Sequence, residues 1–121
     1  MFGLFNKSSD KAKKWETIQS LEDLDAAVEA SFQNPVVLFK HSTTCSISGM
    51  AKSRLEVAND DSSPTIYYLD LWTYRSISNE IADRFRVRHE SPQVLVLNKG
   101  EVQYHASHGA INMKDLVLNA Q

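Results

Sequence analysis

The residue with the clearest chemical potential is Cys45, the one cysteine in the chain. It lies between an apolar run, Pro35 to Phe39, and a helical pattern of apolar residues that begins near Ser46. A thiol on the first turn of a helix lies beside unpaired backbone N–H groups and at the positive end of the helix dipole. Both features favour the thiolate, which is the nucleophilic form of cysteine. Position alone leaves two interpretations open, a redox thiol and an inert buried cysteine.

The residue at position 48 indicates how such a thiolate would be used. Thiol–disulfide exchange proceeds by attack of a thiolate on a disulfide sulfur, which forms a mixed disulfide. Ser48 lies three residues after Cys45 on the same helical face, so its hydroxyl could donate a hydrogen bond to the sulfur or make a local backbone bond. Without a second cysteine there, the chain cannot resolve its own mixed disulfide. This pattern favours removal of a small-thiol adduct from a protein over the activity of a dithiol reductase.

Two further groups of side chains are candidates for the same chemistry. His41 precedes the cysteine by four residues. It would raise the thiolate fraction if protonated, or it packs as a histidine at the end of a strand. Arg86, Arg88 and His89 cluster just before Pro92. They could bind the carboxylates of an acidic small thiol, or form a solvated loop.

Composition excludes several other classes of protein. The chain has 121 residues, 42% of them hydrophobic, and a formal net charge of -2, which suits one compact domain and gives no basic excess for nucleic acid. One cysteine excludes an intramolecular disulfide, and the four histidines lack the spacing of a structural zinc site. Residues 1–14 resemble neither a signal peptide nor a transmembrane segment. We therefore expect a cytoplasmic protein with an N-terminal tail at 1–14 and one domain at 15–121.

The apolar patterns predict alternating strands and helices. Strands are expected over 15–18, 35–39, 65–71, 93–98 and 101–105, the last two joined by a turn at 99–100. Helices are expected after Ser20, from Ser46, after Ser78 and after Asn112. The second helix should bury a stripe of five residues: Ile47, Met50, Ala51, Leu55 and Ala58. Strands separated by helices should run parallel, and ligands should bind beyond their carboxyl ends, where the cysteine lies.

Three features together resemble the thioredoxin superfamily from about Trp15 onward. A cysteine follows a buried strand at a helix start, and residues 81–102 are similar to the thioredoxin stretch of helix, cis-proline, strand and Lys/Asn-Gly hairpin. A loop at Gly109 and a final helix follow at the usual distance. The resemblance implies an α/β, thioredoxin-like fold. Its central mixed β-sheet would have parallel strands plus a C-terminal antiparallel hairpin, with helices on both faces.

Within the superfamily, the chain resembles the monothiol bacilliredoxin-like (YtxJ) family of the bacillithiol system. The cysteine motif of that family appears as Ser42-Thr-Thr-Cys-Ser-Ile-Ser48, and its His-Glu-Ser-Pro-Gln motif appears as His89 to Gln93. One residue departs from the pattern, because Ser46 replaces the family's proline. A proline at the first helical position pre-sets the backbone, so the change bears on how rigidly the thiolate is held.

The resemblance implies a monothiol oxidoreductase that acts on thiolated proteins through Cys45. It would remove bacillithiol or a glutathione-like small thiol, with that thiol as co-substrate and no tightly bound cofactor. Pro92 would be cis, which leaves the backbone of Ser91 free to pair with an extended substrate. His108 would shape the groove or cap the last helix. Expected substrate contacts are Thr44, Ser46, His89, Ser91, Pro92 and His108.

The sequence also bears on three other interpretations. A peroxiredoxin is disfavoured because the upstream proline is missing, although Ser42 has the right spacing. An iron–sulfur glutaredoxin would carry Cys-Gly-Phe-Ser where this chain has Cys-Ser-Ile-Ser. The serious rival is a thioredoxin-fold binding or stress-response protein whose thiol is not used in catalysis, and the reactivity of Cys45 separates it from the enzyme.

Overall fold

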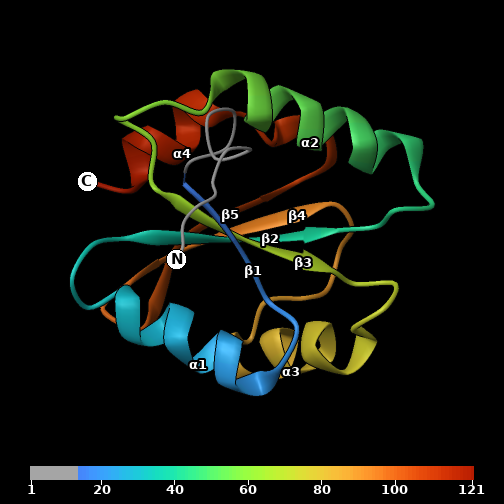
Figure 1. Ribbon diagram of the computed structural model, residues 1–121, viewed down its shortest axis with the longest axis horizontal. Helices are drawn as coiled ribbons and strands as arrows, with labels where there is room; N and C mark the ends of the chain where they lie inside the picture. Colours follow the sequence, from blue (N-terminus) through green and yellow to red (C-terminus); the bar gives the residue numbers. More distant parts are fainter. Residues whose placement is uncertain (1–13) are drawn as a thin grey trace, which may run out of the picture.

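A central sheet with helices on both faces forms the architecture of the computed structural model, which describes residues 14–121 (Figure 1). The tail expected at 1–14 therefore lies outside the described residues, apart from Lys14. No helix in the described range is long and apolar enough to cross a membrane. The elements are β1 (Trp15–Thr17), α1 (Leu21–Ala30), β2 (Val36–His41), α2 (Ser46–Ala58), β3 (Thr65–Asp70), α3 (Arg75–Phe85), β4 (Gln93–Asn98), β5 (Glu101–Ser107), η2 (His108–Ala110) and α4 (Met113–Asn119).

The sheet has the strand order β1-β3-β2-β4-β5. β3 runs parallel to β1 and β2, whereas β4 runs antiparallel to β2 and β5 antiparallel to β4. The predicted mixed sheet is confirmed, but the expectation that every strand following a helix runs parallel is wrong for β4. The chain enters β4 from the edge of the sheet at which α3 begins, so β4 runs in reverse.

Capping side chains start the first and last helices where the sequence predicts them. Ser20 Oγ accepts from the backbone N–H of Asp23 at 3.0 Å, and the Asp23 carboxylate accepts from Gln19 N–H at 2.8 Å. Asn112 Oδ1 accepts from the backbone N–H of Asp115 at 2.9 Å. Each cap supplies a partner for a backbone N–H that has none within the helix.

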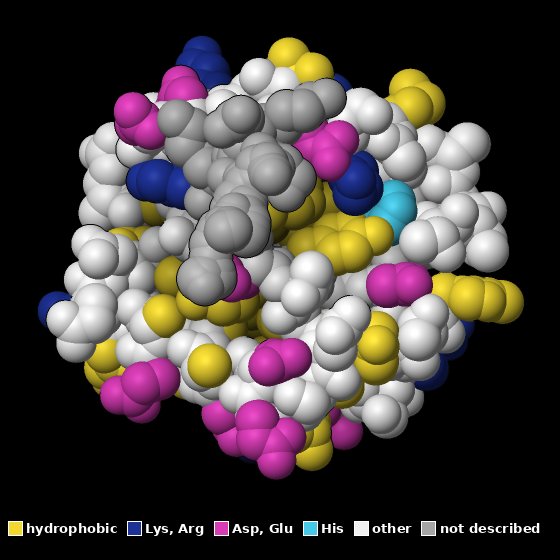
Figure 2. Space-filling model, in the orientation of Figure 1, with side chains coloured by type: hydrophobic (Ala, Val, Ile, Leu, Met, Phe, Trp, Pro, Cys, Tyr) yellow, Lys and Arg dark blue, Asp and Glu magenta, His cyan; other side chains and the backbone are white. Residues whose placement is uncertain are grey.

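Two hydrophobic layers fill the space between the sheet and the helices. Side chains alternate along β2, so Val36 and Leu38 pack towards α1 and α3, whereas Val37 and Phe39 pack towards α2 and α4. Figure 1 shows the same arrangement, with α2 and α4 above the sheet and α1 and α3 below it. The outer face of α1 is acidic and exposed, with Glu22, Asp25 and Glu29, and Figure 2 shows acidic side chains along its lower edge.

Two helix predictions differ from the structure. In the predicted stripe of α2, Ala51 and Leu55 are buried, as expected, and Ser48 joins them. Ile47 and Met50 are 52% and 61% exposed, and Ala58 is exposed as well, so these three predictions are wrong. The buried face of α2 includes a polar residue, Ser48. The spacing of apolar residues alone therefore predicts the buried face of the helix only in part. The third helix begins at Arg75 and not after Ser78, so that Ser78 lies buried within α3.

Gly100→Ala is expected to lower the free energy of unfolding by about 1–2 kcal/mol, the cost of a left-handed backbone for a residue with a side chain. Gly100 has φ +80 in the hairpin turn, and an added Cβ would lie 3.0 Å from the Phe32 ring. Gly49→Ala is the matched control. A Cβ there meets nothing within 4 Å, so this helical change should stabilise by about 0.5–1 kcal/mol. Urea unfolding measures both, and equal stability of Gly100→Ala and the parent would contradict the prediction.

Candidate active site

Cys45 lies at the junction of β2 and α2, as the sequence predicts. It is the residue before the first turn of α2, with extended backbone, and its side chain is partly exposed. Its N–H donates to Ser42 O at 3.2 Å, and its carbonyl accepts from Gly49 N–H at 3.1 Å. The thiol therefore sits at the positive end of the helix dipole and is accessible to solvent.

The cis-proline loop lies at the same edge of the sheet as Cys45. The Ser91–Pro92 peptide bond is cis, as predicted. Antiparallel pairing of Lys40 with Gln93 brings the end of β2 and the start of β4 together at this edge. The structure thus places the cysteine segment and the proline segment on neighbouring strands.

Ser48 is fully buried and forms two strong hydrogen bonds below the cysteine turn. Its Oγ accepts from Ser42 N–H at 2.9 Å and lies 2.7 Å from His41 Nδ1. These are the partners of its side chain within residues 14–121. Of the two predicted bonds, the structure therefore shows the local backbone bond and not the bond to the Cys45 sulfur. Ser48 instead ties the Ser42–Cys45 turn to α2 and to the end of β2.

His41 packs inside the domain. It is 5% exposed, with its ring 5.4 Å from the Tyr68 ring and 5.8 Å from the Phe39 ring. Burial lowers the pKa of His41, and the positive charge of Lys52 lowers it further. The imidazole is therefore neutral at neutral pH, and of the two predicted roles the structure supports the packed histidine.

Thr44 and Ser46 flank the cysteine and are exposed. Thr44 Oγ1 lies 3.1 Å from Ser42 Oγ, which draws its hydroxyl towards the turn. Ser46 is the first residue of α2, so the helix begins at the expected position without the family's proline. Both residues are exposed to solvent next to the thiol.

The loop before β4 and the residues after β5 meet around Pro92. Pro92 is buried, and its carbonyl accepts from His108 N–H at 3.1 Å, which confirms that His108 lies beside the proline. His108 does not cap the last helix, because Asn112 does. Ser91 Oγ is buried and has no hydrogen-bond partner within the described range.

Two residues that sequence reasoning missed position His89. Lys40 is fully buried, and its Nζ lies 3.1 Å from His89 Nδ1. The Gln93 side chain donates to Arg88 O at 2.9 Å and so fixes the loop that carries His89. The alternation of side chains in β2 could have indicated that Lys40 is buried, because Lys40 lies on the same face of the strand as Val36 and Leu38.

The comparisons with known proteins agree with this geometry. A family profile described as monothiol bacilliredoxin BrxC matches residues 16–116. The chain belongs to the monothiol bacilliredoxin family. Membership gives it a redox role with thiol partners, carried by its single cysteine.

Solved structures confirm the thioredoxin fold of this bacilliredoxin. A candidate oxidoreductase with a thioredoxin fold is 28% identical, with a TM-score of 0.80 over 90% of this chain and 96% of that one. The thioredoxin Mala s 13 of Malassezia sympodialis is 14% identical, with a TM-score of 0.67 over 87% and 89% of the two chains. Spinach chloroplast thioredoxin f, short form, is 18% identical, with a TM-score of 0.63 over 91% and 92%.

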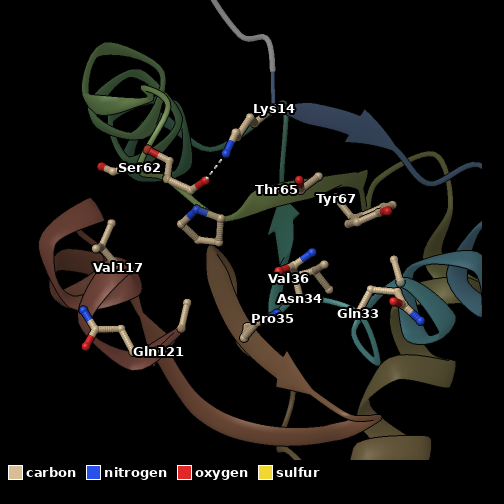
Figure 3. A pocket seen from close by; sticks show the side chains of 14 residues that line it. Lys14, Gln33, Asn34, Pro35, Val36, Ser62, Thr65, Tyr67, Val117 and Gln121 are labelled. Atoms are coloured by element: carbon tan, nitrogen blue, oxygen red, sulfur yellow. Dashed lines mark hydrogen bonds between the residues drawn. The ribbon is translucent and has the colours of Figure 1, made fainter.

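A pocket of about 630 Å³ lies at the opposite end of this bacilliredoxin's sheet. It is lined by the starts of β2 and β3, the end of α4, and Lys14, which donates to Ser63 O at 3.0 Å (Figure 3). Cys45 lies beyond the far end of β2, so this hollow is separate from the thiol. The part of the chain that the structure describes holds no group of three side chains suited to a metal ion.

Proposed function

We propose that this bacilliredoxin removes a low-molecular-weight thiol from protein mixed disulfides through Cys45. The observation that carries the proposal is the single, partly exposed thiol at the start of α2, at the same edge of the sheet as the cis Ser91–Pro92 bond. The small thiol, bacillithiol or a glutathione-like compound, is a co-substrate, and no tightly bound cofactor takes part. The reaction suits the reducing cytoplasm, where a second thiol is at hand to reset the protein.

The exchange runs in two balanced steps. The Cys45 thiolate attacks the sulfur of the small thiol, the mixed disulfide of the target breaks, and the target cysteine leaves as a thiolate that takes a proton from water. Cys45 then carries the small thiol as its own mixed disulfide. A second thiolate from solution or a partner attacks this adduct and restores Cys45. No other sulfhydryl of this chain can do so, since Cys45 is the one cysteine.

The substrate would lie between the cysteine turn and the proline loop. In the proposed complex, the backbone of Ser91 pairs with an extended segment of the target protein. Thr44 and Ser46 border the thiol on one side, and His89 and His108 border Pro92 on the other. All four side chains are on exposed residues, which is compatible with contact to a ligand.

The test is transfer of a small thiol from a modified protein, followed by intact mass. A target carrying bacillithiol, and separately one carrying glutathione, is incubated with the wild-type protein and with Cys45→Ala. We expect loss of the adduct from the target and a matching mass gain on wild type. Cys45→Ala should lose essentially all transfer, because it removes the nucleophile.

A second measurement separates this proposal from a non-catalytic binding protein. Cys45 should react with iodoacetamide at pH 6 faster than free cysteine does, because the thiol is partly exposed at the positive end of the α2 dipole. Transfer that continues in Cys45→Ala, or a thiol no more reactive than free cysteine together with no transfer, would end the enzymatic proposal.

A further inference from the structure

Lys40 is a buried cation with an unusual partner. It lies near the end of the central strand β2, is fully buried, and donates to His89 Nδ1 at 3.1 Å. Among residues 14–121 no carboxylate forms an ion pair with it, because the ion pairs there are made by Lys52 and Arg84. A lysine without a carboxylate partner is costly to bury, so its position needs an explanation.

The contact fixes which nitrogen of His89 carries hydrogen. A lysine ammonium has three donors and no acceptor, so His89 Nδ1 must accept. Ser78 Oγ lies 3.4 Å from the same nitrogen, and its hydroxyl can donate to it as well. The single hydrogen of the neutral ring is therefore on Nε2, on a residue that is exposed to solvent.

The surroundings also keep His89 uncharged. Burial of the ring lowers the pKa of His89, and the charges of Lys40 and Arg75 lower it further, against an opposing effect of Glu90. Burial lowers the pKa of Lys40 to about 8, so Lys40 still carries its proton at neutral pH. Lys40 and Arg75 thus place two positive charges near His89, against the one negative charge of Glu90.

We propose that Lys40 is a positioning residue that locks His89 as a neutral donor through Nε2–H, directed at an anionic group of the small thiol. The ligand class is a low-molecular-weight thiol with carboxylates. The identity of the ligand rests on the proposed function. The effect of Lys40 on the tautomer of His89, called the Lys40–His89 lock below, does not. The placement suits the role, because His89 lies two residues before the cis Ser91–Pro92 bond and Gln93 holds its loop.

The lock is tested by nitrogen-15 NMR of the histidine rings. In the wild type, His89 should show hydrogen on Nε2 and a bare Nδ1, and it should titrate below the ordinary histidine range. Lys40→Met removes the hydrogen bond to Nδ1 and the positive charge beside the ring. The His89 pKa should therefore rise, and the two neutral tautomers should both be populated. Lys114→Met removes an exposed lysine on α4 and should leave the His89 signals unchanged. A wild-type His89 with hydrogen on Nδ1, or one unmoved by Lys40→Met, would overturn the lock.

Recognition is tested with two disulfides that differ in charge. Bacillithiol disulfide carries carboxylates, whereas bis(2-hydroxyethyl) disulfide carries none. Lys40→Met should slow the second-order reaction of Cys45 with the first by about tenfold, the worth of one hydrogen bond to a charged group, and leave the second unchanged. His89→Phe should show the same selective loss, because it removes the donor itself and leaves Lys40 in place. Equal effects on both disulfides would overturn the recognition role. If Cys45 of the wild type reacts with neither disulfide, the proposed function is wrong. The NMR experiment would still show whether Lys40 fixes the tautomer of His89.

Discussion

Lys40→Met is expected to raise the free energy of unfolding by about 3 kcal/mol at pH 7. Burial lowers the Lys40 pKa from 10.5 to about 8, and each unit corresponds to about 1.4 kcal/mol of preference for the neutral form. Methionine has a similar length and no charge, so it fills the same space without that cost. Even a buried ion pair, when apolar residues of similar volume replace it, often gives a protein that is equally stable or more stable by about 1–4 kcal/mol.

The gain should depend on pH with a defined sign. Below pH 8 the lysine is charged in both the folded and the unfolded protein, so the full cost of burying the charge is present. Between pH 8 and 10.5 the unfolded chain binds the extra proton, so wild-type stability rises and the advantage of methionine shrinks. Urea unfolding of both proteins at pH 7 and pH 9.5 measures this. A variant no more stable than wild type at pH 7, or an advantage that grows with pH, would contradict the assignment.

Burial of the charged Lys40 lowers the stability of the folded protein, so we look for its role in function. The role we infer is the orientation of His89 beside Pro92. Lys40→Met should therefore be more stable and at the same time a poorer reactant with carboxylate-bearing disulfides. Opposite changes of stability and activity are expected where a polar group is buried for function.

Ser48→Ala is expected to lower the free energy of unfolding by about 2–4 kcal/mol, the cost of two buried polar groups left without partners. The hydroxyl is the partner of Ser42 N–H and of His41 Nδ1, and all three residues are buried. Freed from Ser48, the turn that carries Cys45 should also lose its fixed position. Transfer of the small thiol should then slow, since the sulfur is held less well against the substrate.

Ser46→Ala is the matched control for this change. Ser46 lies in the same helical turn but is exposed, so its replacement should alter stability by less than about 0.5 kcal/mol. Ser48→Cys keeps the size of the side chain but replaces a strong hydrogen-bonding group with a weak one. It should therefore be destabilised as well. Wild-type stability in Ser48→Ala would show that the contacts with Ser42 and His41 contribute little.

Local sequence was sufficient wherever a feature depends on neighbours along the chain. The start of α2 at Ser46 follows from the end of an apolar run, and the caps at Ser20 and Asn112 follow from side chains three residues from their partners. The cis bond at Pro92 was predicted from a motif shared with a family. Local sequence and the shared motif thus predicted the order of strands and helices. They also predicted the positions of Cys45 and of the proline loop.

Only the folded chain decided which side chains of distant segments meet. Lys40 and His89 are separated by 49 residues, and they meet because the antiparallel register of β2 and β4 brings Lys40 beside Gln93. The predicted donor to the sulfur, Ser48, bonds instead to His41 on another element. The sequence by itself determined that one thiol would stand at a helix start. Tertiary packing decided the rest, because hydrogen-bond partners are chosen by distance in space and by the need to satisfy buried polar groups.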